Sequence, residues 1–112
     1  MAYTQRLVYE TLRSADTASA AAYLALGTPL SNAASIVKMV NNSNKTLIIS
    51  IDGINDHDVC PNNSFWLYDA TSDSPNNSAV FIPKGTNFFV KTSDGAAGTG
   101  TVYLVVQYIV QV

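Results

Sequence analysis

Apolar and polar residues alternate with a period of two over much of this chain. The clearest case is TVYLVVQYIVQV, residues 101–112, whose even-numbered positions are all apolar and whose odd-numbered positions are half apolar. This pattern predicts one long strand with a core face and a second face that is partly covered as well. The predicted core face carries Val102, Leu104, Val106, Tyr108, Val110 and Val112.

Shorter segments rich in β-branched and aromatic residues also predict strands. They are residues 36–40 (IVKMV), 46–51 (TLIISI), 65–69 (FWLYD), 79–82 (AVFI) and 87–92 (NFFVKT). Turn-forming sequences separate them, among them NNSN at 41–44, PKG at 83–85 and SDGAAGTG at 93–100. Short strands spaced in this way predict an all-β fold, an antiparallel β-sandwich of jelly-roll or immunoglobulin-like type with about seven to eight strands.

The first third of the chain is less regular. Residues 1–14 alternate weakly and are too apolar for a free tail, so we expect an N-terminal arm or edge strand ahead of a single sandwich domain at 15–112. The arm would pair with a sheet edge in its own domain or on an adjacent subunit. Residues 16–26 fit a short helix, with Asp16 as N-cap and Gly27 as C-cap, or a narrow alanine-rich strand, and both remain open.

Charge is sparse for a chain of this size. The chain has 112 residues, enough for one domain, but only 12% are charged while 47% are hydrophobic, and the net charge is −2. We therefore expect a homo-oligomer or burial against other proteins. The pI of about 4.9 argues against a nucleic-acid partner. No apolar run reaches the roughly 18 residues that a membrane helix needs, so we expect no membrane partner.

The segment SIDGINDHDVCP, residues 50–61, gathers the most chemistry-bearing side chains. It does not match an EF-hand calcium loop, and His57 with Cys60 supplies only two zinc ligands, so we predict no metal. We interpret it as a structural turn before a strand at Val59 that Pro61 ends. The residues assigned to structural turns are Asp52, Gly53, Asp56, His57, Gly85 and Gly95.

No catalytic pattern is better supported. His57 is the single histidine, and nothing in the sequence places Asp52 and Asp69 across a cleft for sugar hydrolysis. The glycines near residue 98 lead into a strand and form no phosphate cradle. We predict a protein that is not an enzyme and that has no cofactor. Phe65, Trp66 and Tyr68 allow two interpretations, a sugar-binding platform or part of the core.

Two segments supply the predicted interface. The arm brings apolar and basic residues together, and the terminal strand has a second, half-apolar face. We expect the basic residues of the arm to meet acidic loops such as the one at Asp56 and Asp58. The predicted interface residues are Tyr3, Arg6, Leu7, Tyr9, Arg13, Tyr103, Val105 and Ile109.

Three successive stretches of the chain are LGTPLSNAASIVKMVNNSNKTLIISIDGINDHDVCPNNSFWLYDATSD, FIPKGTNFFVK and GTGTVYLVVQY. Together they resemble the small structural proteins encoded among the virion genes of tailed bacteriophages. The resemblance covers residues 26–109 and is one of strands and turns, with no catalytic signature. It implies a β-sandwich subunit at the head surface, the neck or collar, or the tail, with other virion proteins as partners.

One cysteine and the absence of a secretory signal at the N-terminus fit assembly in a reducing bacterial cytoplasm before incorporation into the virion. Two alternatives remain. One is a carbohydrate- or receptor-binding module of a phage tail, which would show an exposed aromatic pair beside Asp52 or Asp56. The other is a small metal-dependent enzyme.

Overall fold

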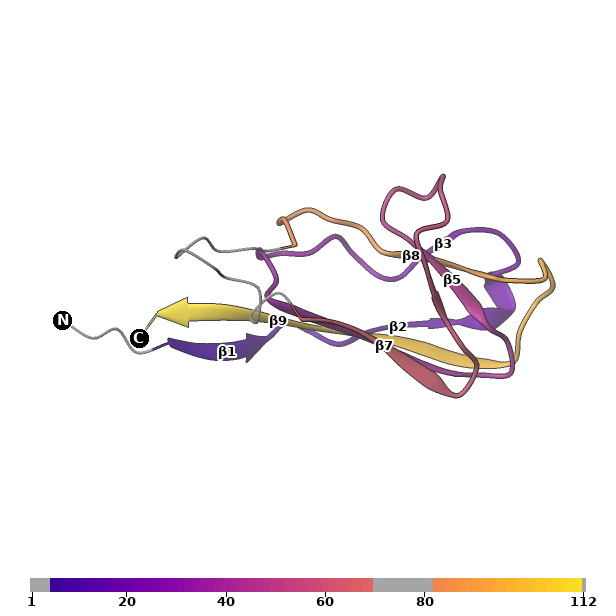
Figure 1. Ribbon diagram of the computed structural model, residues 1–112, viewed down its shortest axis with the longest axis horizontal. Helices are drawn as coiled ribbons and strands as arrows, with labels where there is room; N and C mark the ends of the chain where they lie inside the picture. Colours follow the sequence, from indigo (N-terminus) through magenta and orange to yellow (C-terminus); the bar gives the residue numbers. More distant parts are fainter. Residues whose placement is uncertain (1–4, 70–81, 112) are drawn as a thin grey trace.

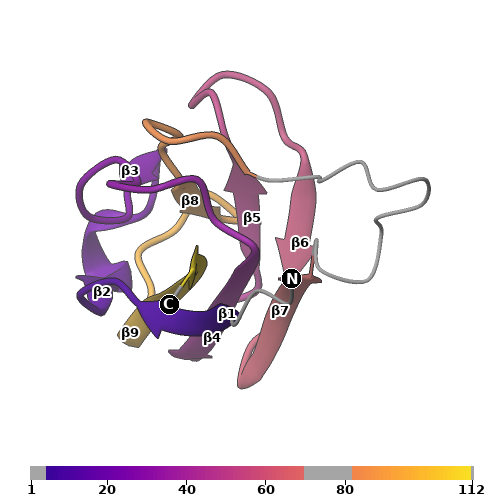
Figure 2. The same cartoon turned by 90° about the vertical axis from the view of Figure 1, so that its left-hand side faces the viewer.

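A computed structural model describes residues 5–69 and 82–111 of the chain, and it is all-β (Figure 1). Two antiparallel sheets pack face to face, as the end-on view in Figure 2 shows. Sheet A contains β1 (Gln5–Tyr9), β2 (Arg13–Asp16), β9 (Gly100–Gln111), β4 (Ile36–Ser43) and β7 (Ser64–Asp69), with both β1 and β2 on one side of β9. Sheet B contains β3 (Leu24–Ala25), β8 (Phe89–Thr92), β5 (Leu47–Ser50) and β6 (Asp58–Cys60), in that order. The predicted β-sandwich is confirmed.

The order of the strands distinguishes between the two predicted types of sandwich. If β1 and β2 count as two halves of one edge strand, the first strand pairs with the last (β9), and β3 pairs with β8. Inside these, β4 pairs with β7 and β5 with β6. Such nested pairs describe one long hairpin rolled into two four-stranded sheets, which is the jelly-roll arrangement and not the immunoglobulin one.

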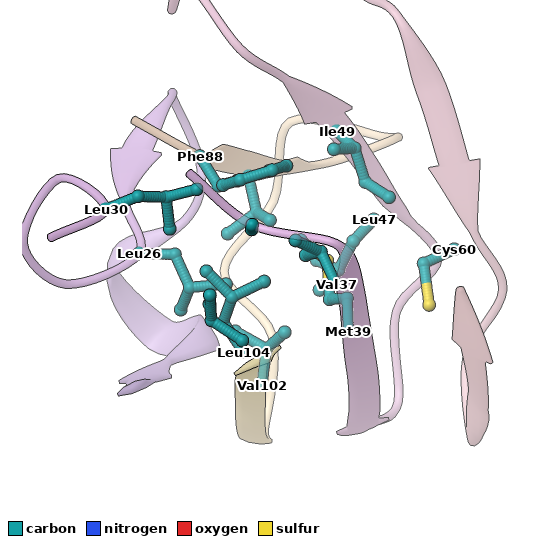
Figure 3. Close-up of a cluster of buried hydrophobic side chains, with 13 residues drawn as sticks. Leu26, Leu30, Val37, Met39, Leu47, Ile49, Cys60, Phe88, Val102 and Leu104 are labelled. Atoms are coloured by element: carbon teal, nitrogen blue, oxygen red, sulfur yellow. The ribbon is translucent and has the colours of Figure 1, made fainter. Parts of the chain in front are cut away.

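The core lies between the inner faces of the two sheets, as Figure 3 shows. Val102, Leu104 and Val106 of β9 are buried there, as the period of two predicted, and Val37 and Met39 of β4 lie beside them. Tyr108 and Val110, on the same predicted face, are only partly buried and lie outside this core. Sheet B and the loops contribute the facing side chains, which are Leu26, Leu30, Leu47, Ile49, Cys60, Phe88 and Val90. The alternation of buried and exposed residues therefore fixes which face of each strand meets the core.

β4 is longer than the predicted strand at residues 36–40. It continues through Ser43, so the expected turn at 41–44 is wrong at its first three positions. The reason is Asn41, which is buried and whose side-chain amide donates to the carbonyl oxygens of Lys45, Cys60 and Pro61. A polar residue that satisfies nearby backbone groups can occupy an inner strand position.

The region 16–26 contains one turn of 3₁₀ helix, η1 (Thr17–Ser19), and the two-residue strand β3, so neither a helix nor a strand across the whole of 16–26 is correct. Asp16 does cap it, accepting a hydrogen bond from the Ala18 N–H at 2.9 Å. The chain then leaves helical geometry because β3 pairs with β8, and Leu26 N–H donates to the Phe88 carbonyl at 2.7 Å. Pairing with sheet B outweighs the helix propensity of the alanines.

In the described part of the N-terminal segment, β1 and β2 form an edge of sheet A in their own domain. β1 pairs with the C-terminal half of β9 and β2 with the N-terminal half, and the Glu10 N–H bonds to the Val106 carbonyl between them. β2 spans the position at which we separated arm from sandwich. The predicted strand at 79–82 lies outside the described residues except Ile82, which forms an isolated bridge with Ala34. No helix within the described part of the chain is long and apolar enough to cross a membrane.

Candidate interaction surface on sheet A

The outer face of sheet A, defined here by the side chains opposite the core on β1, β9, β4 and β7, is largely apolar. The strand register sets these side chains in rows: Tyr103 lies opposite Val40, which lies opposite Phe65. In the rows nearer the termini, Leu7 lies opposite Ile109. The side chains of the face are Leu7, Tyr9, Ile36, Lys38, Val40, Asn42, Phe65, Leu67, Asp69, Thr101, Tyr103, Val105, Gln107 and Ile109.

Several of these side chains are open to water. Tyr9 is 66% exposed, Phe65 61% and Leu67 51%. Lys38, opposite both Leu67 and Val105, brings one positive charge to the middle of the face, and Asp69 brings a negative one to its edge. A contiguous apolar patch with so little charge is typical of a protein interface.

The structure brings most of the predicted interface residues to this one face. Leu7, Tyr9, Tyr103, Val105 and Ile109 all lie on it, although they come from opposite ends of the sequence. Tyr3 lies outside the described residues. The backbone of Arg6 pairs with Val110 in the β1–β9 ladder.

Arg13 does not belong to this surface, contrary to our expectation. Only 8% of it is exposed, and its guanidinium donates to Glu10 at 2.9 Å and to the carbonyls of Thr28 and Pro29. Burial alone would raise the pKa of Glu10, but hydrogen bonds from Arg13 and Asn32, with others, outweigh it and lower that pKa. The pair therefore ties the β1–β2 junction to the loop at 27–32, and Arg13 does not reach the acidic loop at Asp56 and Asp58.

The polar segment 50–58 is a turn whose groups bond to one another. Asp52 accepts hydrogen bonds from the backbone N–H groups of Ile54 and Asn55 and from the Asn55 side chain, which together hold its pKa well below the usual range. His57 Nδ1 accepts from the Ile51 N–H at 3.1 Å. The predicted turn geometry agrees with this structure: Gly53 has φ +74°, and the other turn glycines, Gly85 and Gly95, also have positive φ.

Asp56 connects this turn to sheet B. It accepts a hydrogen bond from the Tyr23 hydroxyl and lies 3.1 Å from Lys91 Nζ, and these two contacts lower its pKa. Lys91 also lies over the Tyr23 ring, 4.5 Å from its centroid. Reduced access of water to the Tyr23 hydroxyl, with the bond to Asp56, raises the pKa of Tyr23 to about 12. These carboxylates are engaged in structural contacts.

Metal and nucleophile chemistry receive no support from the described residues. Nowhere in residues 5–69 and 82–111 do three His, Cys, Asp or Glu side chains gather closely enough to hold a metal ion. Cys60 is buried and burial raises the pKa of its thiol, which disfavours the reactive thiolate. The sequence reasoning missed the buried Asn41 and the Glu10–Arg13 pair, because neither has a signature in local spacing.

Comparison with known proteins adds no further assignment. No protein-family model matches the sequence, and no curated protein or solved structure matches it. Among the described residues, the outer face of sheet A is therefore the strongest indication of function.

Proposed function

We propose that this protein is a non-enzymatic structural subunit of a tailed-phage virion that assembles with copies of itself and with neighbouring virion proteins. The observation that carries the proposal is the outer face of sheet A, an apolar surface built across four strands. Its chemistry is that of burial and not of catalysis.

The sparse charge of the face favours a second copy as its first partner. A stable interface buries about 800 Å² per partner, roughly one eighth of the 6423 Å² accessible surface of this chain. The face carries little charge, and two copies of such a face can meet in a self-complementary way about a twofold axis. A net charge of −2 gives only weak repulsion between copies.

The virion assignment draws on two further observations. The first is the resemblance described above, which covers residues 26–109 and is one of strands and turns. The jelly roll is also a common fold of viral capsid domains, although lectin domains share it. The fold therefore supports a structural role in a particle but does not select a position at the head, neck or tail.

Assembly can be tested by light scattering after size-exclusion chromatography. We expect the protein to be oligomeric and Phe65→Asp to be monomeric, because the substitution places a negative charge on the apolar face. Ile54→Asp is the matched control: Ile54 is 79% exposed but lies in the polar turn near sheet B, so this variant should remain oligomeric. A monomeric parent protein that binds no virion protein, or equal loss in both variants, would contradict the proposal.

The virion assignment needs its own experiment. Antibodies against the purified chain, applied with gold labels to purified particles of the tailed phage that encodes it, should mark one part of the particle by electron microscopy. Labelling confined to the lysate, with none on the particles, would rule out a virion component and leave only the assembly proposal.

A further inference from the structure

We propose a second, independent site: the cavity of about 360 Å³ between β7 and β6, lined by Trp66, Tyr68 and Phe88, binds the ring of a neutral saccharide. The cavity lies at the side of the sandwich where the edge strands of the two sheets come together. Trp66 and Tyr68 point to the opposite face of β7 from Phe65, so the site is separate from the outer face of sheet A.

The aromatic wall of the cavity is held in place before any ligand arrives. The Trp66 indole N–H donates to Asp58 Oδ2 at 2.7 Å, and the Trp66 ring packs against Phe88 with centroids 6.2 Å apart. Tyr68 stands 6.4 Å from Trp66 with the planes inclined by 30°, and it is 41% exposed. A rigid aromatic surface of this kind binds with little loss of side-chain entropy.

Polar groups suited to hydroxyls line the same cavity. Asp58 accepts from Trp66 and from the Val59 N–H, which leaves lone pairs on its carboxylate for further donors. His57 accepts from the Ile51 N–H through Nδ1, so the neutral ring carries its proton on Nε2, which lies 3.9 Å from Asp52 Oδ2; a ligand hydroxyl would compete with that carboxylate for the proton. Thr86 adds a hydroxyl to the lining, although its own proton is directed to the Pro83 carbonyl.

The chemistry of the lining selects the ligand class. Asp58 is the one residue of formal charge among the residues that line the cavity, so anionic ligands are disfavoured. A pyranose ring has weakly positive C–H groups for the negative faces of the aromatic rings and hydroxyls for Asp58 and His57. The volume lies at the lower end of the range of about 300 to 1,000 Å³ for small-molecule sites, enough for one or two sugar rings.

Trp66 is the single tryptophan of the chain, so its indole N–H gives one assignable signal in a ¹⁵N-correlation spectrum. We would titrate the full-length protein separately with methyl α-glucopyranoside, N-acetylglucosamine and choline. We expect a saturable shift of the Trp66 signal with at least one of the two sugars, with a Kd on the order of 1 mM. Choline tests whether the aromatic residues prefer a cation instead.

Two variants of β7 complete the test. Tyr68→Leu keeps apolar bulk but removes one ring, and it should weaken sugar binding about tenfold. Phe65→Ala, on the opposite face of the same strand, should bind as the parent does. Backbone amide spectra verify folding in both. The proposal is overturned if neither sugar shifts the Trp66 signal up to about 50 mM, if choline alone binds, or if Phe65→Ala loses binding as strongly as Tyr68→Leu.

Discussion

The outer faces of sheets A and B are both built from apolar strands, but they differ in whether another segment of the chain covers them. On sheet B, the turn at 50–58 folds back over the sheet, so that a Cβ added at Gly53 would lie 3.4 Å from the Phe89 ring. Asp56 of this turn meets Lys91 of β8. On sheet A, no described segment covers Phe65 or Leu67. The polar turn therefore covers the outer face of sheet B, while Phe65 and Leu67 on the outer face of sheet A stay exposed.

This difference separates two uses of charge. Around sheet B the carboxylates of Asp52, Asp56 and Asp58 hold a turn, a lysine and an indole in place. At the edge of sheet A, the Glu10–Arg13 pair holds the β1–β2 junction against the loop at 27–32, while the outer face of the sheet stays largely apolar. The charged groups therefore stabilise the boundaries of the two faces, and among the described residues the outer face of sheet A stays exposed.

We expect the largest loss of stability from a substitution at the edge of sheet A. Arg13→Met keeps much of the side chain but leaves the carboxylate of Glu10 buried without its cation, so it should destabilise the fold by about 3 to 5 kcal/mol. It should also weaken assembly, because β1 carries Leu7 and Tyr9 of the outer face. Urea unfolding followed by Trp66 fluorescence measures the first effect and light scattering the second. Lys45→Met, which breaks the exposed pair with Asp94, should change stability much less.

The cover of sheet B should respond to Gly53→Val. The φ of +74° at this position disfavours any side chain and a branched one most, and the new atoms would meet Phe89, so we expect a loss of about 1 to 3 kcal/mol. Assembly through sheet A should persist once the protein is folded. Gly95→Val is the control for strain alone, since a Cβ there meets nothing within 4 Å. Equal losses in the two variants would show that contact with Phe89 adds nothing.

Acid should loosen the turn that covers sheet B. The pKa of Asp52 and that of Asp56 are lowered in the folded protein, so their contribution to stability is present above the ordinary aspartate pKa of about 3.9 and is lost as pH falls through the folded values. Asp56→Asn should flatten this dependence and return the pKa of Tyr23 toward 10. Urea midpoints between pH 7 and pH 2, together with ultraviolet titration of the tyrosines, measure both. An unchanged slope in Asp56→Asn would contradict this assignment.

His57→Gln should have the smallest effect. The glutamine side-chain oxygen can accept the hydrogen bond of the Ile51 N–H that Nδ1 now accepts, and the backbone bond from His57 N–H to the Ile49 carbonyl remains. We expect a change below about 1 kcal/mol and unchanged assembly, measured as for the other variants. A tightly bound metal that is lost in this variant would reverse our interpretation of the turn.

Local sequence patterns predicted the strands and their faces well, because burial imposes a period of two on each strand separately. The core positions of β9 and the turn at Gly53 could both be found in this way. The pairing of β1 and β2 with β9 could not be predicted from local patterns, because it joins residues about a hundred positions apart. Pairing with any other apolar sheet edge would have fitted the alternation of the N-terminal residues equally well.

The candidate surface was predicted only in part. Tyr103 and Val105 followed from alternation, but Phe65 and Leu67 were placed on the face by the register of β7 against β4. Arg13 was misassigned because a positive charge near an apolar segment usually lies at the surface, and nothing in the spacing shows that Glu10 and two carbonyl oxygens surround it. Asn41 was missed because nothing in the local spacing shows that the carbonyl oxygens of Lys45, Cys60 and Pro61 surround its side chain.

The central place of β9 has a consequence for how this protein comes to be folded. β1, β2 and β4 all pair with β9, which follows every other described strand along the chain. During translation the first strands emerge without their partner, and sheet A cannot close until β9 has left the ribosome. Closing loops of this length makes folding slow and leaves apolar edges open in the meantime. Refolding after dilution from urea should therefore take milliseconds to seconds, and a ribosome-tethered chain that lacks residues 100–112 should remain sensitive to protease.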